Sequence, residues 1–312
     1  MKPIITCGEI LVEVMAKEKD QAFIEIGEYL GPYPSGAPAI FINQVAKLNT
    51  PAAIIGSVGN DDFGSACLKR LTQNGVDTSL IQVDPERPTG TAFVTYEQSG
   101  DRAFIFNIAH SAAGQVSLSE VSRARLKNAS VFHVMGSSVF STEAIALLKE
   151  AMGLAKEGGA LISFDPNVRK ELLGDKALFS FFKDVLAQTD IFLPSGEELF
   201  DLTGTQTESE ALEAAFALGV SEIVLKKGHQ GCAYFSPTEH YRCDAYKVDE
   251  VDATGAGDTF GATFIAARQN GIAPHQALML ANASGAMAVS AWGPMEGAAN
   301  QAQIESFIAS FA

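Results

Sequence analysis

The sequence predicts an α/β protein with a mostly parallel sheet and helices on both of its faces. Short apolar runs alternate with segments of helical periodicity along most of the 312 residues, and this alternation is typical of parallel strands joined by helices. Few polar residues interrupt the apolar runs, as expected of strands that are covered on both faces. A chain of this length can bury a self-sufficient core, so we expect a single domain over residues 1–312.

Six apolar runs are expected to form strands: residues 4–12, 52–58, 130–135, 160–164, 190–193 and 222–225. Five segments have helical spacing: residues 38–48, 62–73, 141–157, 195–203 and 208–218. Residues that commonly end helices follow three of these segments, at Asn49-Thr50-Pro51, Asn74-Gly75 and Gly158-Gly159.

Two segments depart from the alternation of strands and helices. Residues 22–30 show partial alternation with no following helix, and residues 91–108 have the pattern of a hairpin around a five-residue loop that contains glycine. Such a hairpin is either a lid over the carboxyl edge of the main sheet or an ordinary antiparallel edge, and the pattern does not separate these alternatives.

Charge and composition exclude several classes of protein. With 22 basic and 37 acidic residues the net charge is −15, which argues against general nucleic-acid binding and against attachment to an anionic membrane. A small anionic ligand can still bind to a local backbone pocket. The first residues do not resemble a signal peptide and no run approaches the ~20 apolar residues of a membrane span, so we expect a cytoplasmic protein.

The segment most informative about chemistry is residues 250–262, where an alternating stretch passes into a long helical pattern that ends near Asn270. Gly255, Ala256 and Gly257 let another molecule approach the backbone, and the first N–H groups of a helix attract anions. Asp258 falls in the first turn, where we expect its carboxylate to be ionised and able to accept a proton. The alternative is an ordinary turn followed by an acidic residue that compensates the helix dipole.

Residues 252–260, Asp-Ala-Thr-Gly-Ala-Gly-Asp-Thr-Phe, resemble the C-terminal signature of the ribokinase-like (phosphofructokinase-B type) carbohydrate kinases. The resemblance implies that Asp258 is the catalytic base and that Gly255, Ala256 and Gly257 form the anion hole. It also implies a ribokinase-like fold with a small β-sheet lid, formed from about residues 13–35 and 88–112. The substrates would be a sugar and ATP, with Mg²⁺ as the metal.

Further motifs extend the resemblance to the sugar side of the site. Gly8-Glu-Ile-Leu-Val-Glu13 is similar to the opening strand of the family and implies that Glu13 binds sugar hydroxyls, although many members have Asp there. Pro34-Ser-Gly-Ala-Pro-Ala39 resembles the first signature and places Ser35 and Gly36 at the floor of the sugar site. Arg169, after a strand-end motif at 164–168, either holds a phosphate or sugar oxygen or forms a surface salt bridge.

On the nucleotide side, Pro194-Ser-Gly-Glu-Glu198 resembles an element of the family that binds phosphate and Mg²⁺. The resemblance implies that Ser195 contacts phosphate and that Glu198 holds Mg²⁺ through water. Glu198 could equally be a solvated acid at the start of a helix. The stretch that begins at Lys226 is similar to the nucleotide loop and implies backbone contacts at Gly228 and Gly231.

Two further assignments on the nucleotide side follow from the resemblance. Asn282 is similar to the residue beside the adenine, the alternative being a packing residue in a helix of small side chains. Asp252 and Thr254 lie where members that require K⁺ bind it.

The substrate has to be inferred separately, because members of this family phosphorylate several sugars and nucleosides. Asn107 falls where ketodeoxygluconate kinases carry an arginine, and an amide suits a neutral hydroxyl better than a carboxylate. We therefore expect a neutral sugar. Stretches such as residues 34–42 resemble tagatose-kinase members most, which implies phosphorylation of a primary hydroxyl of a ketohexose, tagatose or fructose. The alternatives are a 2-keto-3-deoxygluconate kinase and a non-catalytic sugar- or nucleotide-binding regulator, and a homodimer through the lid is expected by analogy.

Overall fold

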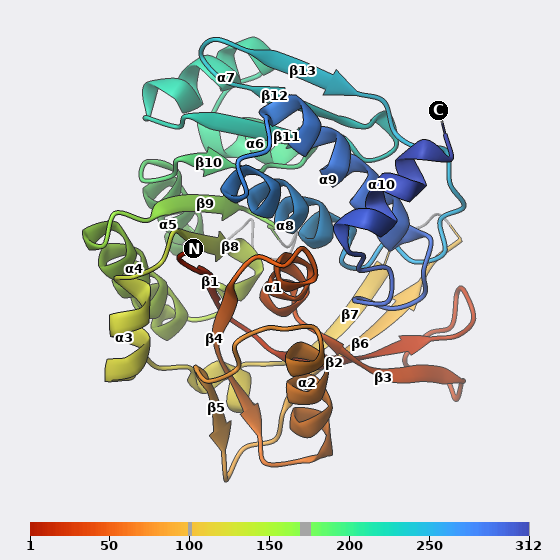
Figure 1. Cartoon of the computed structure of the whole chain (residues 1–312). Coiled ribbons are helices and arrows are strands. Elements are labelled where there is room, and N and C mark those ends of the chain that lie inside the picture. Colours follow the sequence, from red (N-terminus) through yellow and green to blue (C-terminus); the bar gives the residue numbers. More distant parts are fainter. Residues whose placement is uncertain (99–101, 169–175, 312) are drawn as a thin grey trace.

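A computed structural model describes residues 1–98, 102–168 and 176–311 (Figure 1). In this part of the chain a nine-stranded sheet has the order β13-β12-β11-β10-β9-β8-β1-β4-β5. Its strands, in chain order, are β1 (Ile4–Cys7), β4 (Ala52–Gly59), β5 (Ile81–Asp84), β8 (Val131–Met135), β9 (Leu161–Asp165), β10 (Ile191–Phe192), β11 (Glu222–Lys226), β12 (Cys232–Phe235) and β13 (His240–Cys243).

Among the described strands of this sheet, neighbours from β11 to β5 are parallel, whereas β12 and β13 at one edge pair antiparallel. The prediction of a mostly parallel α/β sheet is therefore confirmed. Because the strands run in the same direction, their carboxyl ends meet at one edge, which is where α/β proteins bind ligands.

Helices cover both faces of this sheet. One face carries α1 (Ala37–Lys47), α2 (Asp62–Gln73), α8 (Ala256–Gln269), α9 (Pro274–Val289) and α10 (Gln301–Ala309). The other face carries α3 (Glu120–Leu126), α4 (Thr142–Glu157), α5 (Lys176–Leu186), α6 (Gly196–Thr203) and α7 (Glu208–Ala217).

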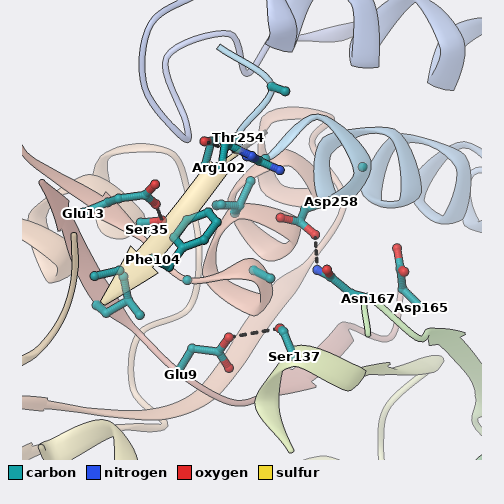
Figure 2. Close-up of a pocket in the computed structure, with 18 of the residues that line it drawn as sticks. Glu9, Glu13, Ser35, Arg102, Phe104, Ser137, Asp165, Asn167, Thr254 and Asp258 are labelled. Carbon is teal, nitrogen blue, oxygen red and sulfur yellow. Dashed lines mark hydrogen bonds between the residues drawn. The ribbon is translucent and has the colours of Figure 1, made fainter. Parts of the chain in front are cut away.

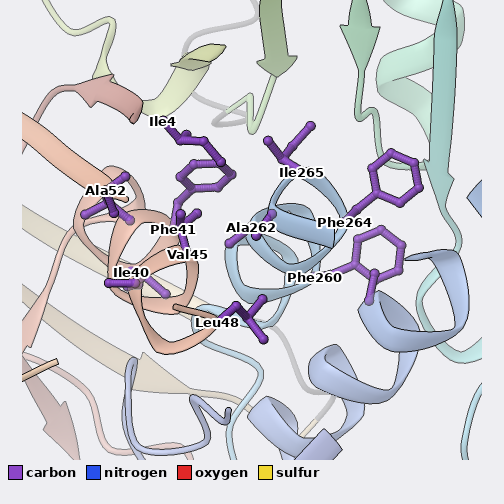
Figure 3. Close-up of a cluster of buried hydrophobic side chains, with 14 of the residues drawn as sticks. Ile4, Ile40, Phe41, Val45, Leu48, Ala52, Phe260, Ala262, Phe264 and Ile265 are labelled. Carbon is purple, nitrogen blue, oxygen red and sulfur yellow. The ribbon is translucent and has the colours of Figure 1, made fainter. Parts of the chain in front are cut away.

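Alternate residues of the strands enter the two cores that these helices form. Within β1, Ile4 packs into one core and Ile5 into the other, which explains why the strand has no polar face. Figure 3 shows the first core, where Phe41 of α1 and Phe264 of α8 are fully buried. This packing fixes α8 against α1 and so sets the position of the helix end that bears Asp258.

The strand predicted over residues 4–12 is two strands in the structure. The chain leaves the main sheet after Cys7 and enters a second sheet at Leu11. At Gly8 the backbone passes so close to Ser138 that a Cβ would lie 2.1 Å from its Oγ. The break could not be predicted from the sequence, because both strands are buried and the residues are mostly apolar throughout.

The second, smaller sheet has the order β3-β2-β6-β7 within the described residues. Its strands are β2 (Leu11–Ala16), β3 (Tyr29–Ser35), β6 (Gly90–Tyr96) and β7 (Arg102–Asn107). The predicted hairpin over 91–108 is confirmed as the antiparallel pair β6 and β7. The alternation expected over 22–30 becomes a strand only from Tyr29, and Ile24 and Ile26 are fully exposed in the irregular segment before it.

Candidate active site

A cavity of about 540 Å³ lies between the carboxyl edge of the main sheet and the small sheet (Figure 2). The ends of β9 and β11, the segments that follow β1, β8 and β10, and the start of α8 form one side. Strands of the small sheet form the other side. In Figure 2, Asp258 and Asp165 face Glu13 and Phe104 across this space.

The loop before α8 places Asp258 in the cavity wall. Gly255 is the N-cap residue with a left-handed φ of 76°, and a Cβ there would lie 2.5 Å from the carbonyl oxygen of Pro294. Glycine is therefore required by the backbone at this position. At Gly257 a Cβ would meet the Lys226 Nζ at an ordinary 3.7 Å, so the missing side chain there leaves room for a ligand beside an ammonium group.

The three residues of the predicted anion hole differ in their position relative to the cavity. The N–H of Ala256 donates a long 3.4 Å hydrogen bond to the carbonyl of Ala253, and Ala256 does not line the cavity, whereas Gly255 and Gly257 do. The N–H groups of residues 257 and 258 belong to the first helical turn, where no intrahelical acceptor exists. Among the residues of this turn, the N–H groups that lack an intrahelical acceptor and lie beside the cavity are thus those around Gly257.

Asp258 is 7% exposed, and its Oδ1 accepts a hydrogen bond of 3.3 Å from the Asn167 amide. Burial, and after it the nearby charge of Asp165, raise the pKa of the carboxyl to about 8 against the opposing charge of Lys226. The expectation that Asp258 is ionised at neutral pH is therefore wrong for the ligand-free protein. The start of α8 stabilises the carboxylate form of Asp258, but by less than burial and the neighbouring carboxylate of Asp165 destabilise it.

Lys226 ends β11 and points its ammonium group into the cavity. Its Nζ lies 2.5 Å from Oδ2 of Asp165, which is 1% exposed. Burial by itself lowers the pKa of Lys226, but the carboxylates of Asp165 and Glu198 outweigh burial and raise it, so the group remains a cation. The other oxygen of Asp165, Oδ1, is buried without a hydrogen-bond partner.

Glu198 lies in the first turn of α6 and borders the same cavity. Its Oε2 accepts the backbone N–H of Ser195 at 2.7 Å, and its Oε1 accepts that of Val168 at 2.8 Å. The carboxylate is thus a helix-capping group held in a fixed orientation, and each oxygen keeps a lone pair for a further partner. Burial raises its pKa, while the charge of Lys226 opposes this shift.

Glu13, on β2, faces the cavity from the small sheet. It is 4% exposed, and its Oε2 accepts a 2.8 Å hydrogen bond from the Ser35 hydroxyl. Its Oε1 is buried without a partner, and burial raises the pKa of the carboxyl to about 7. An unsatisfied buried oxygen is costly, so this atom is suited to accept a hydrogen bond from a ligand hydroxyl.

Strand β7 turns alternate side chains toward the cavity. Arg102, Phe104 and Phe106 line it, as the period of two in a strand requires. Asn107 has the opposite parity: its amide donates to the Thr91 hydroxyl at 3.1 Å, and it borders a different cavity. The expectation that Asn107 contacts the sugar is therefore corrected, and with it the argument for a neutral sugar that rested on this residue.

Arg102 was not predicted from the sequence, yet it is the cation that the small sheet contributes to the cavity lining among the described residues. Its guanidinium donates to the Thr254 hydroxyl at 3.1 Å and lies 5.5 Å from the centre of the Phe104 ring. It thereby links β7 to the loop that precedes α8. The positions of Arg102, Phe104 and Phe106, spaced two apart in the predicted hairpin, were the signal for one common face.

Asp252 anchors the same loop from outside the cavity. Its Oδ1 accepts hydrogen bonds from the Thr254 N–H at 3.0 Å and the Tyr96 hydroxyl at 3.2 Å, and its Oδ2 accepts the Gly293 N–H at 3.0 Å. Thr254 lines the cavity, whereas Asp252 does not. The carboxylate thus holds the loop in shape.

The remaining predicted positions lie at differing distances from this cavity. Ser35, Gly36 and Ser195 line it, as expected. Gly228, Gly231 and Asn282 are not among the residues that line it. Gly228 begins the short 3₁₀ helix Gly228–Gln230 after β11 and Gly231 follows that helix, while Asn282 on α9 donates to the Asp244 carbonyl at 2.8 Å. Arg169 lies outside the described residues.

Two further polar groups in the cavity were given no role from the sequence. Glu9 is 1% exposed and accepts hydrogen bonds from the hydroxyls of Ser137 at 3.0 Å and Ser138 at 2.6 Å. Asn167 holds Asp258 and has a positive φ of 38°. Both contacts join segments that meet only in the fold. Glu9 follows β1 whereas Ser137 and Ser138 follow β8, and Asn167 follows β9 whereas Asp258 lies in the first turn of α8.

Comparisons with known proteins identify the family of this chain. The model of the pfkB carbohydrate kinase family matches residues 1–301. Fructokinase-1 of Zea mays is 32% identical over 259 residues, which are 82% of this chain and 80% of that protein. A provisional ribokinase II from E. coli, solved with ATP and Mg²⁺, is 45% identical with a TM-score of 0.94 over 99% of this chain and all of that one.

A fructokinase from Vibrio cholerae, solved with fructose, ADP and calcium, is 27% identical with a TM-score of 0.84 over 98% of this chain and 99% of that one. The chain therefore belongs to the PfkB family of carbohydrate kinases and has the ribokinase-like fold. It is an enzyme that phosphorylates sugars. Within the residues that the structure describes, no helix is both long and apolar enough to cross a membrane.

Proposed function

We propose that the protein transfers the γ-phosphoryl group of ATP to a primary hydroxyl of a ketohexose, fructose or tagatose. The observation that carries the proposal is the placement of Asp258, buried at the start of α8, across one cavity from the unpartnered oxygen of Glu13. The names of the fructokinases that resemble this chain support the class of sugar. The carboxylates of Glu9 and Glu13 in the lining suit a polyhydroxylated, uncharged ligand.

The sugar binds, in this proposal, between Glu13 and Asp258. Oε1 of Glu13 accepts a hydrogen bond from a sugar hydroxyl, while Ser35 fixes the other oxygen of the carboxylate and Gly36 lies in the adjoining wall. This contact orients the primary hydroxyl toward Asp258. Orientation of the reacting group is worth a large part of the rate enhancement in such transfers.

Asp258 acts as the general base. Its carboxylate accepts the proton of the primary hydroxyl, the sugar oxygen attacks the γ-phosphorus, and ADP leaves on the opposite side. A pKa of about 8 suits this task, because a base works best when its pKa is near the working pH. Asn167 holds the carboxylate in place through its amide.

The phosphates of ATP would meet the N–H groups around Gly257 and the ammonium of Lys226. Backbone amides at a helix start and a fixed cation stabilise the charge that develops on the transferring group. Thr254 and Ser195 lie within the same lining and are proposed as further phosphate contacts.

The residues present also fit Mg²⁺. In phosphate-transferring sites this ion is held by one or two carboxylates together with phosphates and water, and the buried, unpartnered Oδ1 of Asp165 and the oriented carboxylate of Glu198 supply such a set. When bound, the ion would neutralise phosphate charge.

K⁺ binding near Asp252 and Thr254 stays a prediction. Asp252 already accepts three hydrogen bonds within the chain, so backbone carbonyls would have to supply most of the ligands. Assaying the enzyme in potassium and in sodium salts at equal ionic strength tests this point.

For the base of the nucleotide we propose the surface between Asn282 and the loop that contains Gly228 and Gly231. Asn282 borders a cavity of about 530 Å³ that lies on the β13 side of the sheet. The positive φ of both glycines keeps the loop compact after β11.

We also propose that the small sheet acts as a lid, because it forms one wall of the cavity and reaches the α8 loop through Arg102. A homodimer through this sheet and a cytoplasmic location stay predictions. The exposed Ile105 on the edge strand β7, which does not line the cavity, supports the dimer, and light scattering of the purified protein tests it.

A coupled assay of ADP release tests the function, with tagatose, fructose, ribose, 2-keto-3-deoxygluconate, fructose 6-phosphate and adenosine as acceptors. We expect the highest kcat/KM with a ketohexose. A preference for 2-keto-3-deoxygluconate would contradict the choice of substrate, and calorimetric sugar binding without ADP release at any Mg²⁺ concentration would indicate a regulator instead of an enzyme.

A further inference from the structure

Two of the four cysteines of the chain lie directly opposite each other on adjacent strands. Cys232 begins β12, Cys243 ends β13, and the antiparallel register pairs them. Residues paired in this way have Cα atoms about 4.5–5.5 Å apart, which lies within the range of about 4.4–6.8 Å found across disulfides. Both thiols are free in the structure.

The two side chains point to the same face of the sheet. The next pair on that face, Tyr234 and Tyr241, stacks with ring centroids 5.9 Å apart, so side chains in this ladder turn toward each other. Cys232 belongs to the core that contains α8 and α9, and Cys243 packs against its margin. The thiols are therefore neighbours in space as well as in register.

The two thiols differ in their exposure to solvent, as expected if one reacts with a dissolved oxidant before the other. Cys232 is 3% exposed, whereas Cys243 is partly exposed and borders the 530 Å³ cavity that also contains Asn282. The other two cysteines, Cys7 and Cys67, are both buried. A small oxidant in solution can thus reach Cys243 first.

The electrostatic environment agrees with this order. The neighbouring Cys232 thiol lowers the pKa of Cys243, whereas the neighbouring Cys243 thiol and burial raise the pKa of Cys232. The thiolate is the nucleophilic form of cysteine. The greater exposure of Cys243 and its lowered pKa both favour it as the attacking thiol, with Cys232 as the resolving one.

We propose that Cys243 and Cys232 form a peroxide-sensitive dithiol that closes to a disulfide. The Cys243 thiolate attacks one oxygen of hydrogen peroxide, which gives a sulfenic acid and releases hydroxide. The sulfur of Cys232 then displaces the hydroxyl group from the Cys243 sulfur, and the Cys232 proton leaves with it as water. In total two thiols and one peroxide give one disulfide and two waters.

Closure of this disulfide affects the nucleotide end of the site, a consequence that rests on the proposed function. The residue after Cys243 is Asp244, whose carbonyl accepts the Asn282 amide. A Cβ on Gly231 would lie 2.0 Å from the Cys243 carbonyl oxygen, so the strand end and the loop are in tight contact. Drawing the sulfurs together shifts this contact, and we expect KM for ATP to rise by about two- to tenfold, the worth of one hydrogen bond.

The experiment treats the purified full-length protein with hydrogen peroxide and counts its thiols under denaturing conditions. We expect two of the four to disappear, an intact mass lower by two hydrogen atoms, a Cys232–Cys243 cross-linked peptide, and recovery with dithiothreitol. Four remaining thiols, or a cross-link that involves Cys7 or Cys67, would overturn the proposal. This measurement needs no variant and no activity.

Variants separate the two steps. In Cys232→Ser, oxidation should stop at a sulfenic acid on Cys243 that dimedone labels, and in Cys243→Ser neither product should form, while Cys67→Ala should behave like the unaltered protein. Labelling of Cys232 in the Cys243→Ser protein would contradict the assigned order. A disulfide that forms without a change in KM for ATP would overturn the link to the nucleotide, and a reduced enzyme that releases no ADP would instead refute the proposed function.

Discussion

The assignment of Asp258 as base makes a quantitative prediction about pH. With a pKa of about 8, the carboxyl of the free enzyme is ionised in about one-tenth of molecules at pH 7 and about nine-tenths at pH 9. Because only the ionised form accepts a proton, kcat/KM for the sugar should rise about tenfold between these values. Initial rates in the coupled ADP assay, measured across this range with both substrates below their KM values, give the profile of the free enzyme.

Substitution tests the same residue directly. Asp258→Asn preserves size and hydrogen bonding to Asn167 but removes the base, so turnover should fall by about 10²–10⁴. Asp62→Asn is the matched control, since Asp62 is also in the first turn of a helix but is exposed on α2. Near-normal turnover of Asp258→Asn would refute the assignment.

A second substitution tests the physical cause of the shifted pKa. Asp165 lies beside Asp258 and raises its pKa by repulsion, after the larger effect of burial. In Asp165→Asn the rising limb of the residual activity should therefore move to lower pH. A limb that stays in place would show that the titrating group is not Asp258 or that this carboxylate does not act on it.

Three other outcomes follow from the site. Glu13→Gln should raise KM for the sugar by about ten- to a hundredfold, the worth of a charged hydrogen bond, while Ser35→Ala should raise it less. A KM of Glu13→Gln equal to that of the unaltered enzyme would contradict a sugar contact at Oε1. Arg102→Ala should lower kcat by about ten- to a hundredfold, because it releases β7 from the Thr254 loop. Arg102→Lys keeps the positive charge, so a partial recovery of kcat in this variant would show that the charge contributes as well as the hydrogen bond. Finally, the pKa of Asp258 in the folded protein lies above its unfolded value of 3.8, so the free energy of unfolding falls as pH rises toward 8. Asp258→Asn removes this ionisation and should raise the Tm of the ligand-free protein more at pH 8 than at pH 5. Equal Tm shifts at the two pH values would disprove this.

The fold class and most strand positions could be predicted because burial on both faces leaves a plain apolar run in the sequence. The course of residues 4–12 could not, since β1 and β2 are equally apolar although they belong to different sheets. Helix ends such as the one after α1 were also predictable: Asn49 has a φ of 56°, a conformation that asparagine tolerates better than most residues.

Within the site, local sequence sufficed for groups whose function depends on one turn. The Gly255–Asp258 segment is such a case, because a glycine-rich turn and the first residues of a helix position amides and carboxylate together. Side-chain direction on β7 was different: Asn107 was expected in the site, but the parity of the strand places Arg102 there instead. Which face of a hairpin turns inward depends on what the hairpin packs against.

The sequence by itself thus determined the α/β architecture, the helix that bears Asp258 and the candidate base. Only the tertiary structure decided the protonation of that base, because its pKa depends on burial and on Asp165, which lies 93 positions earlier in the chain. Likewise, only the fold brought Glu13, Lys226 and Arg102 to one cavity. Periodicity and turn chemistry are local properties, whereas desolvation and charge pairing depend on groups that become neighbours only when the sheets assemble.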